Sequence, residues 1–200
     1  MIGTNSSPHP PLLPPEWETT RLIVQDSQTS DVPHLHAVFS ACAYVEPWDP
    51  TFHPVPEAEI AQLVENSLSM DGEQYRFKLQ CMRFRQDSQI CGYFHLYYGI
   101  PQPHLAWVSM FVLHPDYQGQ HIGQEVVAGL ADELRRCGYQ AIWLRVYLKN
   151  WPALRFWTES GFTTIIKYNG KGSISAEAHS SLVLARDLIK PCEGLTQTPC

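Results

Sequence analysis

The segment from Gln118 to Gln124 carries the residue types best suited to bind an anion, because two glycines lead from an apolar run into a helix. Apolar side chains recur at helical spacing after Gly123 and stop at Arg135 and Arg136, where basic residues mark a helix C-terminus. The first amides of such a helix lack intrahelical acceptors, and the peptide dipoles leave partial positive charge there. The turn is therefore predicted to hold a phosphate or pyrophosphate.

Histidines and cysteines are numerous, but their spacing does not indicate a metal site. The nine histidines form no H-E-x-x-H pattern, and the six cysteines form no C-x-x-C pair. His121 lies inside the anion-binding turn, where it would add positive charge when protonated, whereas His114 is expected to end the preceding strand. We therefore predict single roles for these residues and no metal.

Two motifs in this order resemble the signatures of GNAT-type N-acetyltransferases. The first, Gln/Arg-x-x-Gly-x-Gly/Ala at a strand-to-helix turn, is matched by Gln118 and Gly123, with His121 at the middle glycine. The second, Asn-x-x-Ala-x-x-x-Tyr-x-x-x-Gly-Phe, is matched from Asn150 to Phe162, with Trp157 where tyrosine is common. The two motifs together, in this order along one chain, are much less frequent by chance than either motif alone.

The resemblance implies a fold and a donor. The fold is mixed α/β (α+β), with a mostly antiparallel twisted sheet, splayed parallel strands and flanking helices. The donor is acetyl-CoA, whose pantetheine would bond the backbone of the strand before the turn, while the turn amides hold the pyrophosphate. The residues expected to bind it are Phe111, Val112, Leu113, Gln118, Gly119, Gln120, His121, Ile122, Gly123, Gln124, Asn150 and Phe156.

The acid and base that the family often uses are absent. Family members often carry a glutamate on the strand before the turn and a tyrosine on the last helix, but this sequence has Trp107 and Trp157. Ser109 could hold a water, and Tyr147 or, second in order, Tyr168 could protonate the departing thiolate. A satisfied strand serine and core tyrosines with a hydrogen-bonded tip are the structural alternatives.

The acceptor side is expected to lie on the loop between the first two helices. There, Glu46 and Asp49 could receive a cationic amine, with Trp48 and Trp107 as aromatic walls, although solvated loop acids are the alternative. The reading is acetyl transfer to a primary amine of a small molecule or peptide, by direct attack in a ternary complex. The competing reading is a catalytically weak acyl-CoA-binding sensor.

Composition excludes several other classes. The 200 residues are 44% hydrophobic and 17% charged, which suits a folded domain. A net charge of −6 disfavours nucleic acid and anionic membranes as partners. No apolar run is long enough to span a bilayer, and no secretory leader is visible, so a cytoplasmic protein is expected, with a homodimer left open.

The elements that must position these residues follow in a mixed α/β order. Residues 1–16 are rich in proline and are expected to form a flexible arm, residues 17–190 the acetyltransferase domain, and residues 191–200 a loose tail. A first strand begins at Leu22, two helices follow, and residues 74–98 read as a β-hairpin. A strand, helix, strand, helix and closing strands complete the order.

Overall fold

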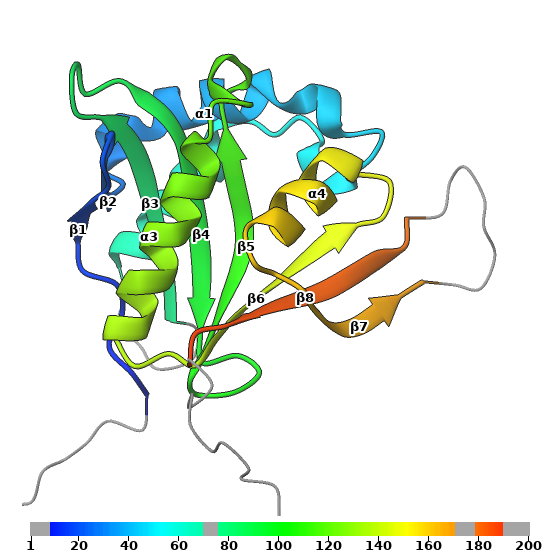
Figure 1. Cartoon of the computed structure of the whole chain (residues 1–200). Coiled ribbons are helices and arrows are strands. Elements are labelled where there is room, and N and C mark those ends of the chain that lie inside the picture. The colour runs from blue at the N-terminus through cyan, green and yellow to red at the C-terminus, as the bar shows by residue number, and fades with distance from the viewer. Residues whose placement is uncertain (1–8, 70–75, 171–178, 190–200) are drawn as a thin grey trace, which may run out of the picture.

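The computed structural model describes residues 9–69, 76–170 and 179–189. Within these ranges the chain forms one eight-stranded sheet in the order β1-β2-β3-β4-β5-β6-β8-β7, with helices on both faces (Figure 1). The pair β5–β6 is parallel and the other pairs are antiparallel. The mixed, mostly antiparallel sheet predicted from the sequence is confirmed.

The structure adds β1 before the first predicted strand, and the other strands and the α-helices follow the predicted order. The strands are β1 (Glu16–Glu18), β2 (Leu22–Asp26), β3 (Arg76–Phe84), β4 (Ile90–Tyr98), β5 (Leu105–Leu113), β6 (Ala141–Tyr147), β7 (Thr164–Asn169) and β8 (Ser181–Asp187). The α-helices are α1 (Val32–Ala41), α2 (Glu57–Leu68), α3 (Ile122–Arg136) and α4 (Trp151–Glu159). Short 3₁₀ turns are η1 (Thr29–Asp31), η2 (Ala43–Val45), η3 (Pro50–Phe52) and η4 (Pro115–Tyr117).

Two hydrophobic cores form because neighbouring strand residues point to opposite faces of the sheet. On β4, Phe94 faces the core that α3 covers with Val126 and Leu130, whereas Tyr93 faces the core that α1 and α2 cover. The apolar residues that repeat at helical spacing on α3 are all buried, namely Ile122, Val126, Val127, Leu130 and Leu134. The sheet is thus fixed between helix layers, and the turn before α3 follows the C-terminal end of β5.

The proline-rich arm differs from its prediction where it is described. Leu13 is only 2% exposed, and the carbonyls of Pro10 and Pro14 accept hydrogen bonds from Arg76 and Gln80 on β3. Proline has no N–H, but its carbonyl remains a good acceptor, so this segment packs against the sheet without forming a long strand. Residues 1–8 and the expected tail at 191–200 lie outside the described residues.

The feature that creates the site is the divergence of β5 from β6. Their pairing runs from Leu105 with Ala141 to Val108 with Leu144, and beyond these residues no pairing continues. Figure 1 shows the two strands side by side at one end and apart at the other, with α4 beside the gap. The predicted splay of the parallel strands is therefore present, and it leaves one edge of β5 unpaired from Ser109 onward.

Candidate functional site

The turn before α3 has the backbone conformation that an anion cradle requires. Gly119 and His121 both have positive φ, at 72° and 59°, so the chain is left-handed at two positions. Glycine is the usual residue in this conformation, which explains why the family motif has a glycine where this chain has His121. The Glu125 N–H donates to the His121 carbonyl at 3.1 Å. The amides before Glu125 are those that a helix start leaves without intrahelical acceptors.

Arg21 holds this turn in place from the start of β2. Its guanidinium donates to the Glu125 carboxylate at 2.6 Å and to the Gln120 carbonyl at 3.1 Å, and its backbone N–H donates to Glu125 at 2.8 Å. Partial burial raises the pKa of Glu125, but hydrogen bonds from Thr19 and Arg21 outweigh it and lower the pKa overall. The resulting anion stays ionised and fixes the first turn of α3.

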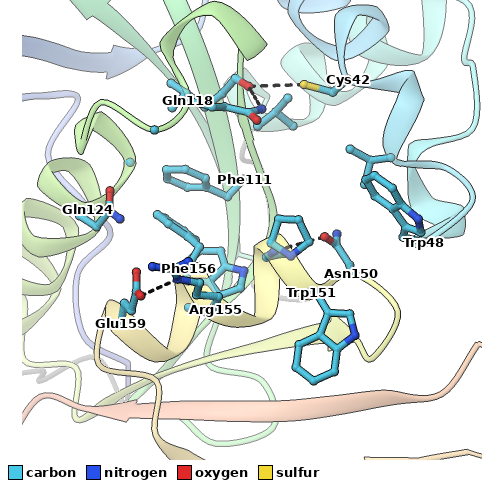
Figure 2. A pocket seen from close by; sticks show the side chains of 18 of the residues that line it. Cys42, Trp48, Phe111, Gln118, Gln124, Asn150, Trp151, Arg155, Phe156 and Glu159 are labelled. Atoms are coloured by element: carbon cyan, nitrogen blue, oxygen red, sulfur yellow. Dashed lines mark hydrogen bonds and ion pairs between the residues drawn. The ribbon is translucent and has the colours of Figure 1, made fainter.

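Gln118 positions the loop and does not aim its side chain at an anion. Its amide donates to the Leu113 carbonyl at 2.9 Å, and its oxygen accepts from the Tyr44 hydroxyl at 3.0 Å. The Leu113 carbonyl also accepts from the Cys42 thiol at 3.4 Å, as the dashed lines in Figure 2 indicate. Leu113 therefore has less acceptor capacity for pantetheine than the sequence predicts, and Gln118 contributes by tying β5 to the loop after α1.

A cavity of about 770 Å³ extends from this turn along α4 to the loop after α1. Figure 2 shows Phe111 in the middle, Gln124 on the α3 side, Trp48 across from it, and Arg155 and Phe156 on α4. The volume lies in the range of cofactor sites. Of the residues predicted to bind acetyl-CoA, those that line this cavity are Phe111, Val112, Leu113, Gln118, Gly119, His121, Ile122, Gly123, Gln124, Asn150 and Phe156.

Gln120 is the predicted cofactor residue that does not line the cavity. Its side-chain amide donates to the Asp116 carbonyl at 2.7 Å, and its own carbonyl accepts from Arg21. Gln120 thus supports the turn from outside. Its backbone lies between the two left-handed residues Gly119 and His121.

Gly123 has a packing role in addition to any contact with phosphate. A Cβ at this position would lie 2.8 Å from the Phe156 ring, so the glycine lets α3 approach α4. The Phe156 ring also meets Phe111 at 5.7 Å and Trp157 at 4.8 Å between centroids. A bulky substitution of Gly123 would disturb these aromatic contacts as well as the turn. Gly119 is therefore the better position to test anion binding by the turn, because a Cβ there would meet no atom within 4 Å.

Asn150 links the larger cavity to a second one. It is 5% exposed and caps α4, with its side-chain oxygen accepting from the Ala153 N–H at 3.2 Å. A second cavity of about 320 Å³ shares five lining residues with the first, namely Phe52, Phe111, Asn150, Ala153 and Trp157. The two cavities therefore meet where β5 and β6 diverge.

Trp157 replaces the tyrosine of the family motif and serves the core. It is 7% exposed and packs edge-on against Phe111 and Phe162. Its indole has no hydroxyl, so it offers no phenolic proton to a departing thiolate. Trp107, the residue at the usual glutamate position, lines the second cavity together with Ser109 and Tyr147.

Ser109 lies on a β-bulge, because His95 pairs with Met110 and Leu96 with Val108. Its hydroxyl donates to the His95 carbonyl at 3.2 Å and lies 2.5 Å from His95 Nδ1. Burial lowers the pKa of His95 to about 3, so the imidazole is neutral. Ser109 is thus a strand serine whose hydroxyl is hydrogen-bonded within the sheet, and it also lines the second cavity.

The two tyrosines considered as proton donors lie in different places. Tyr147 lines the second cavity at the end of β6, and the guanidinium carbon of Arg145 lies 5.4 Å from the centre of its ring. Tyr168 is 54% exposed on β7, where its hydroxyl donates to Ser180 at 3.1 Å. Tyr168 lines neither of these cavities, so of the two tyrosines the structure brings Tyr147 to the smaller cavity.

The two acids between α1 and α2, Glu46 and Asp49, differ in their exposure and in whether they line a cavity. Asp49 is 9% exposed and lines the second cavity, and its Oδ1 accepts from the Thr51 N–H at 3.0 Å and from the Thr51 hydroxyl. Glu46 is exposed and lines neither cavity. Trp48 lines the larger cavity, next to Tyr44, and so does not share a cavity with Trp107, the other aromatic wall that the sequence analysis expects on the acceptor side.

Several residues that line the cavities carry no sequence signal of their own. Cys42 lines the larger cavity, and burial raises the pKa of its thiol to about 11, so it is inert as a nucleophile. Arg145 lines the second cavity, and its spacing of two from Tyr147 on a strand could have placed both on one face. In the described part of the chain, no three His, Cys, Asp or Glu side chains gather as a metal site would need.

The family model of the acetyltransferase (GNAT) family matches residues 41–162, which span both cavities. The chain belongs to the GNAT family. The match includes the cradle, the splayed strands and α4, so the elements that form the site are those that the family model describes. No curated protein sequence matches the chain.

Solved structures share the fold of this GNAT chain. An acetyltransferase of Salmonella typhimurium that modifies the N-terminal serine of ribosomal protein L7/L12 has a TM-score of 0.69 and 18% identity, over 84% of this chain and 96% of that one. Salmonella typhimurium yncA with acetyl-CoA has a TM-score of 0.63 and 14% identity, over 88% and 99%. A spermidine N-acetyltransferase chimera of Vibrio cholerae SpeG and hSSAT has a TM-score of 0.64 and 15% identity, over 84% and 96%.

Over the described residues, no helix has the length and hydropathy needed to cross a lipid bilayer.

Proposed function

We propose that this chain transfers an acetyl group from acetyl-CoA to a primary amine of a small molecule or peptide, by direct attack in a ternary complex. The observation that carries the proposal is the junction of the two cavities at Phe111, Asn150 and Trp157. A thioester in the larger cavity and an amine in the smaller one would meet there. Bringing two reactants together in this way supplies much of a transfer rate.

The larger cavity suits acetyl-CoA on three counts. The left-handed turn and the start of α3 offer backbone amides and partial positive charge to a pyrophosphate. The unpaired edge of β5 offers backbone groups to the amides of pantetheine. One structure of similar fold was solved with acetyl-CoA. When bound, acetyl-CoA supplies an activated acyl group, so the protein needs no acyl intermediate of its own.

The residues of the smaller cavity would assist the transfer. The amine forms a bond to the acyl carbon as the carbon–sulfur bond breaks, and the leaving thiolate needs a proton. Tyr147 is the phenol on this wall and is our assignment for that donor. The amine must also lose a proton, for which Asp49 is the carboxylate of the cavity and Ser109 a hydroxyl that can hold a water.

The acceptor belongs to a broad class at this stage. Proteins of similar fold act on a protein N-terminal serine and on spermidine, so both peptide and small-molecule amines are included. We further propose that the protein acts in the cytoplasm and needs neither nucleic acid nor membrane. Light scattering would test whether it forms a homodimer.

The second candidate is an acyl-CoA-binding module with little catalysis. Trp107 and Trp157 favour it, because they replace the glutamate and tyrosine that the family often uses. Release of free thiol from acetyl-CoA with a panel of amines, followed by mass spectrometry of the products, separates the two. An acetylated amine supports the enzyme, and tight CoA binding by calorimetry without turnover supports the module. Absence of CoA binding would sink both.

A further inference from the structure

Arg145 differs from the other arginines of this chain in the partners of its guanidinium group. Each of the others donates to a carboxylate or a carbonyl, for instance Arg83 to Asp31 at 2.6 Å and Arg186 to the Ser160 carbonyl at 3.0 Å. Within residues 9–69, 76–170 and 179–189, Arg145 has no such acceptor, and the Tyr147 ring is its contact. Its planar group therefore keeps its N–H donors for an external partner.

The position of Arg145 on the wall of the smaller cavity makes its N–H donors available to a ligand bound there. It lines the smaller cavity on β6, one residue beyond Leu144, where the pairing of β5 and β6 ends. The face of Tyr147 under the guanidinium restricts its orientation, because arginine stacks on aromatic rings. A stacked, exposed guanidinium without an internal carboxylate is suited to a bidentate contact with an incoming carboxylate.

Asp49 supplies the opposite charge in the same cavity. These two are the charged residues among its lining, and the other lining residues are apolar, aromatic or neutral. Thr51 occupies Oδ1 of Asp49, and in the described chain Oδ2 accepts no hydrogen bond. A nearly buried carboxylate with one open oxygen gains free energy from a cationic partner.

Asp49 and Arg145 belong to different elements of the smaller cavity, the η3 turn and β6. The Asp49 carbonyl accepts from the N–H of Phe52, which lines both cavities, so Asp49 belongs to the turn that reaches the junction. Arg145, like Asp49, lines the smaller cavity and not the larger one, and it reaches that cavity from β6. An acceptor with its amine near Asp49 would present that amine to the thioester, and its opposite end would reach Arg145.

We propose that the acceptor is a small amino acid, a molecule with both a primary amine and a carboxylate, with the amine at Asp49 and the carboxylate at Arg145. The proposal rests on the proposed acetyl transfer and names its substrate class. The cavity of about 320 Å³ is of a size for such a molecule and small for a folded peptide partner. Aromatic and aliphatic side chains fit its lining of Trp107, Met110 and Phe52.

Matched pairs of acceptors test this directly. Phenylalanine with phenethylamine, leucine with 3-methylbutylamine, and 4-aminobutanoate with butylamine differ within each pair only by the carboxylate. In at least one pair, the wild type should acetylate the carboxylate-bearing member with a kcat/KM at least about tenfold higher, the scale of one charge-assisted contact. Preference for the plain amine in every pair would overturn the proposal.

Substitutions then assign the preference to a side chain. Arg145→Gln should remove it by raising KM for the amino acid about tenfold or more, with KM for the plain amine unchanged. If Arg145 acted only by holding Tyr147, kcat would fall equally for both members. Asp49→Asn, which keeps the Thr51 contacts, should weaken both members. Arg85→Gln, at an exposed arginine paired with Glu18, is the control and should keep the preference. Survival of the preference in Arg145→Gln refutes the anchor.

A binding experiment separates this proposal from the proposed function. Calorimetry with CoA present measures 3-phenylpropanoate and hexanoate, carboxylates without an amine, on the wild type and on Arg145→Gln. Arg145-dependent binding supports the carboxylate site even if no amine is acetylated, in which case acetyl transfer alone fails. Acetylation of plain amines together with no carboxylate binding would keep the transferase and remove the amino-acid acceptor.

Discussion

The two cavities of this site are built on different principles. The larger one depends on backbone shape, because its defining features are the left-handed residues Gly119 and His121, the start of α3 and the open edge of β5. The smaller one depends on side chains, above all Asp49 and Arg145. Backbone shape is suited to a donor that is common to a whole family, and side chains are suited to an acceptor that differs from member to member.

The largest expected effect is a charge placed in the backbone cradle. Gly119→Asp and Gly119→Asn both suit a left-handed position with open space, and they differ by one negative charge. Two unit charges 4 Å apart interact by about 4 kcal/mol at an effective dielectric of 20. We expect Gly119→Asp to lower CoA affinity about 100-fold after screening by salt, and Gly119→Asn to lower it less than about fivefold. Calorimetric titration of both variants measures this, and equal affinities would remove the cradle assignment.

The same contrast explains what the sequence could predict. The proposed cradle lies within a few consecutive residues, and the rules for glycine turns, helix starts and hydrophobic periodicity are local, so the sequence predicted the turn and α3. His121 at a glycine position looked like a departure from the motif, yet it adopts the left-handed backbone that the motif needs.

The acceptor side could not be predicted in this way, because its wall is assembled from segments far apart in the chain. Nothing local separates Asp49 from Glu46 or Tyr147 from Tyr168, and only the fold shows that one of each pair lines a cavity. The packing of Pro10 to Pro15 was missed for the same reason, since its hydrogen bonds go to Arg76, Lys78 and Gln80 on β3.

A substitution on the side-chain cavity should affect the rate and not the donor affinity. Tyr147→Phe removes one hydroxyl and keeps the ring under Arg145, so kcat should fall about 100-fold while CoA affinity stays within about twofold. Tyr168→Phe is the matched control, because that hydroxyl lies on exposed β7 and should leave kcat unchanged. Steady-state kinetics and calorimetry measure both. If Tyr147→Phe turns over at the wild-type rate, the thiolate takes its proton from solvent.

The buried histidine behind Ser109 should make the fold sensitive to acid. The folded pKa of His95 is lowered by burial to about 3, against 6.5 for the ordinary residue. The unfolded chain therefore binds a proton that the folded chain excludes, and stability is lost as pH falls from about 6.5 towards 3. The contribution is at most about 1.4 kcal/mol per pH unit. Urea unfolding between pH 7 and 5 measures this slope, and His95→Gln should be flatter by that amount. Parallel slopes would mean that His95 is protonated in the folded chain.

The smallest effect should come from His121, where backbone and side chain can be separated. A non-glycine residue in the left-handed region costs about 1 kcal/mol, and glycine relieves this but gains entropy in the unfolded chain, so His121→Gly should change stability by less than about 1 kcal/mol. His121→Ala keeps the backbone cost and also loses the imidazole. Because His121 is exposed and water screens its charge, we expect both variants to bind CoA within about threefold of the wild type. Urea unfolding and calorimetry measure the two quantities. A loss beyond tenfold in both variants would make the imidazole a phosphate ligand and bring side-chain recognition into the cavity that we assign to the backbone.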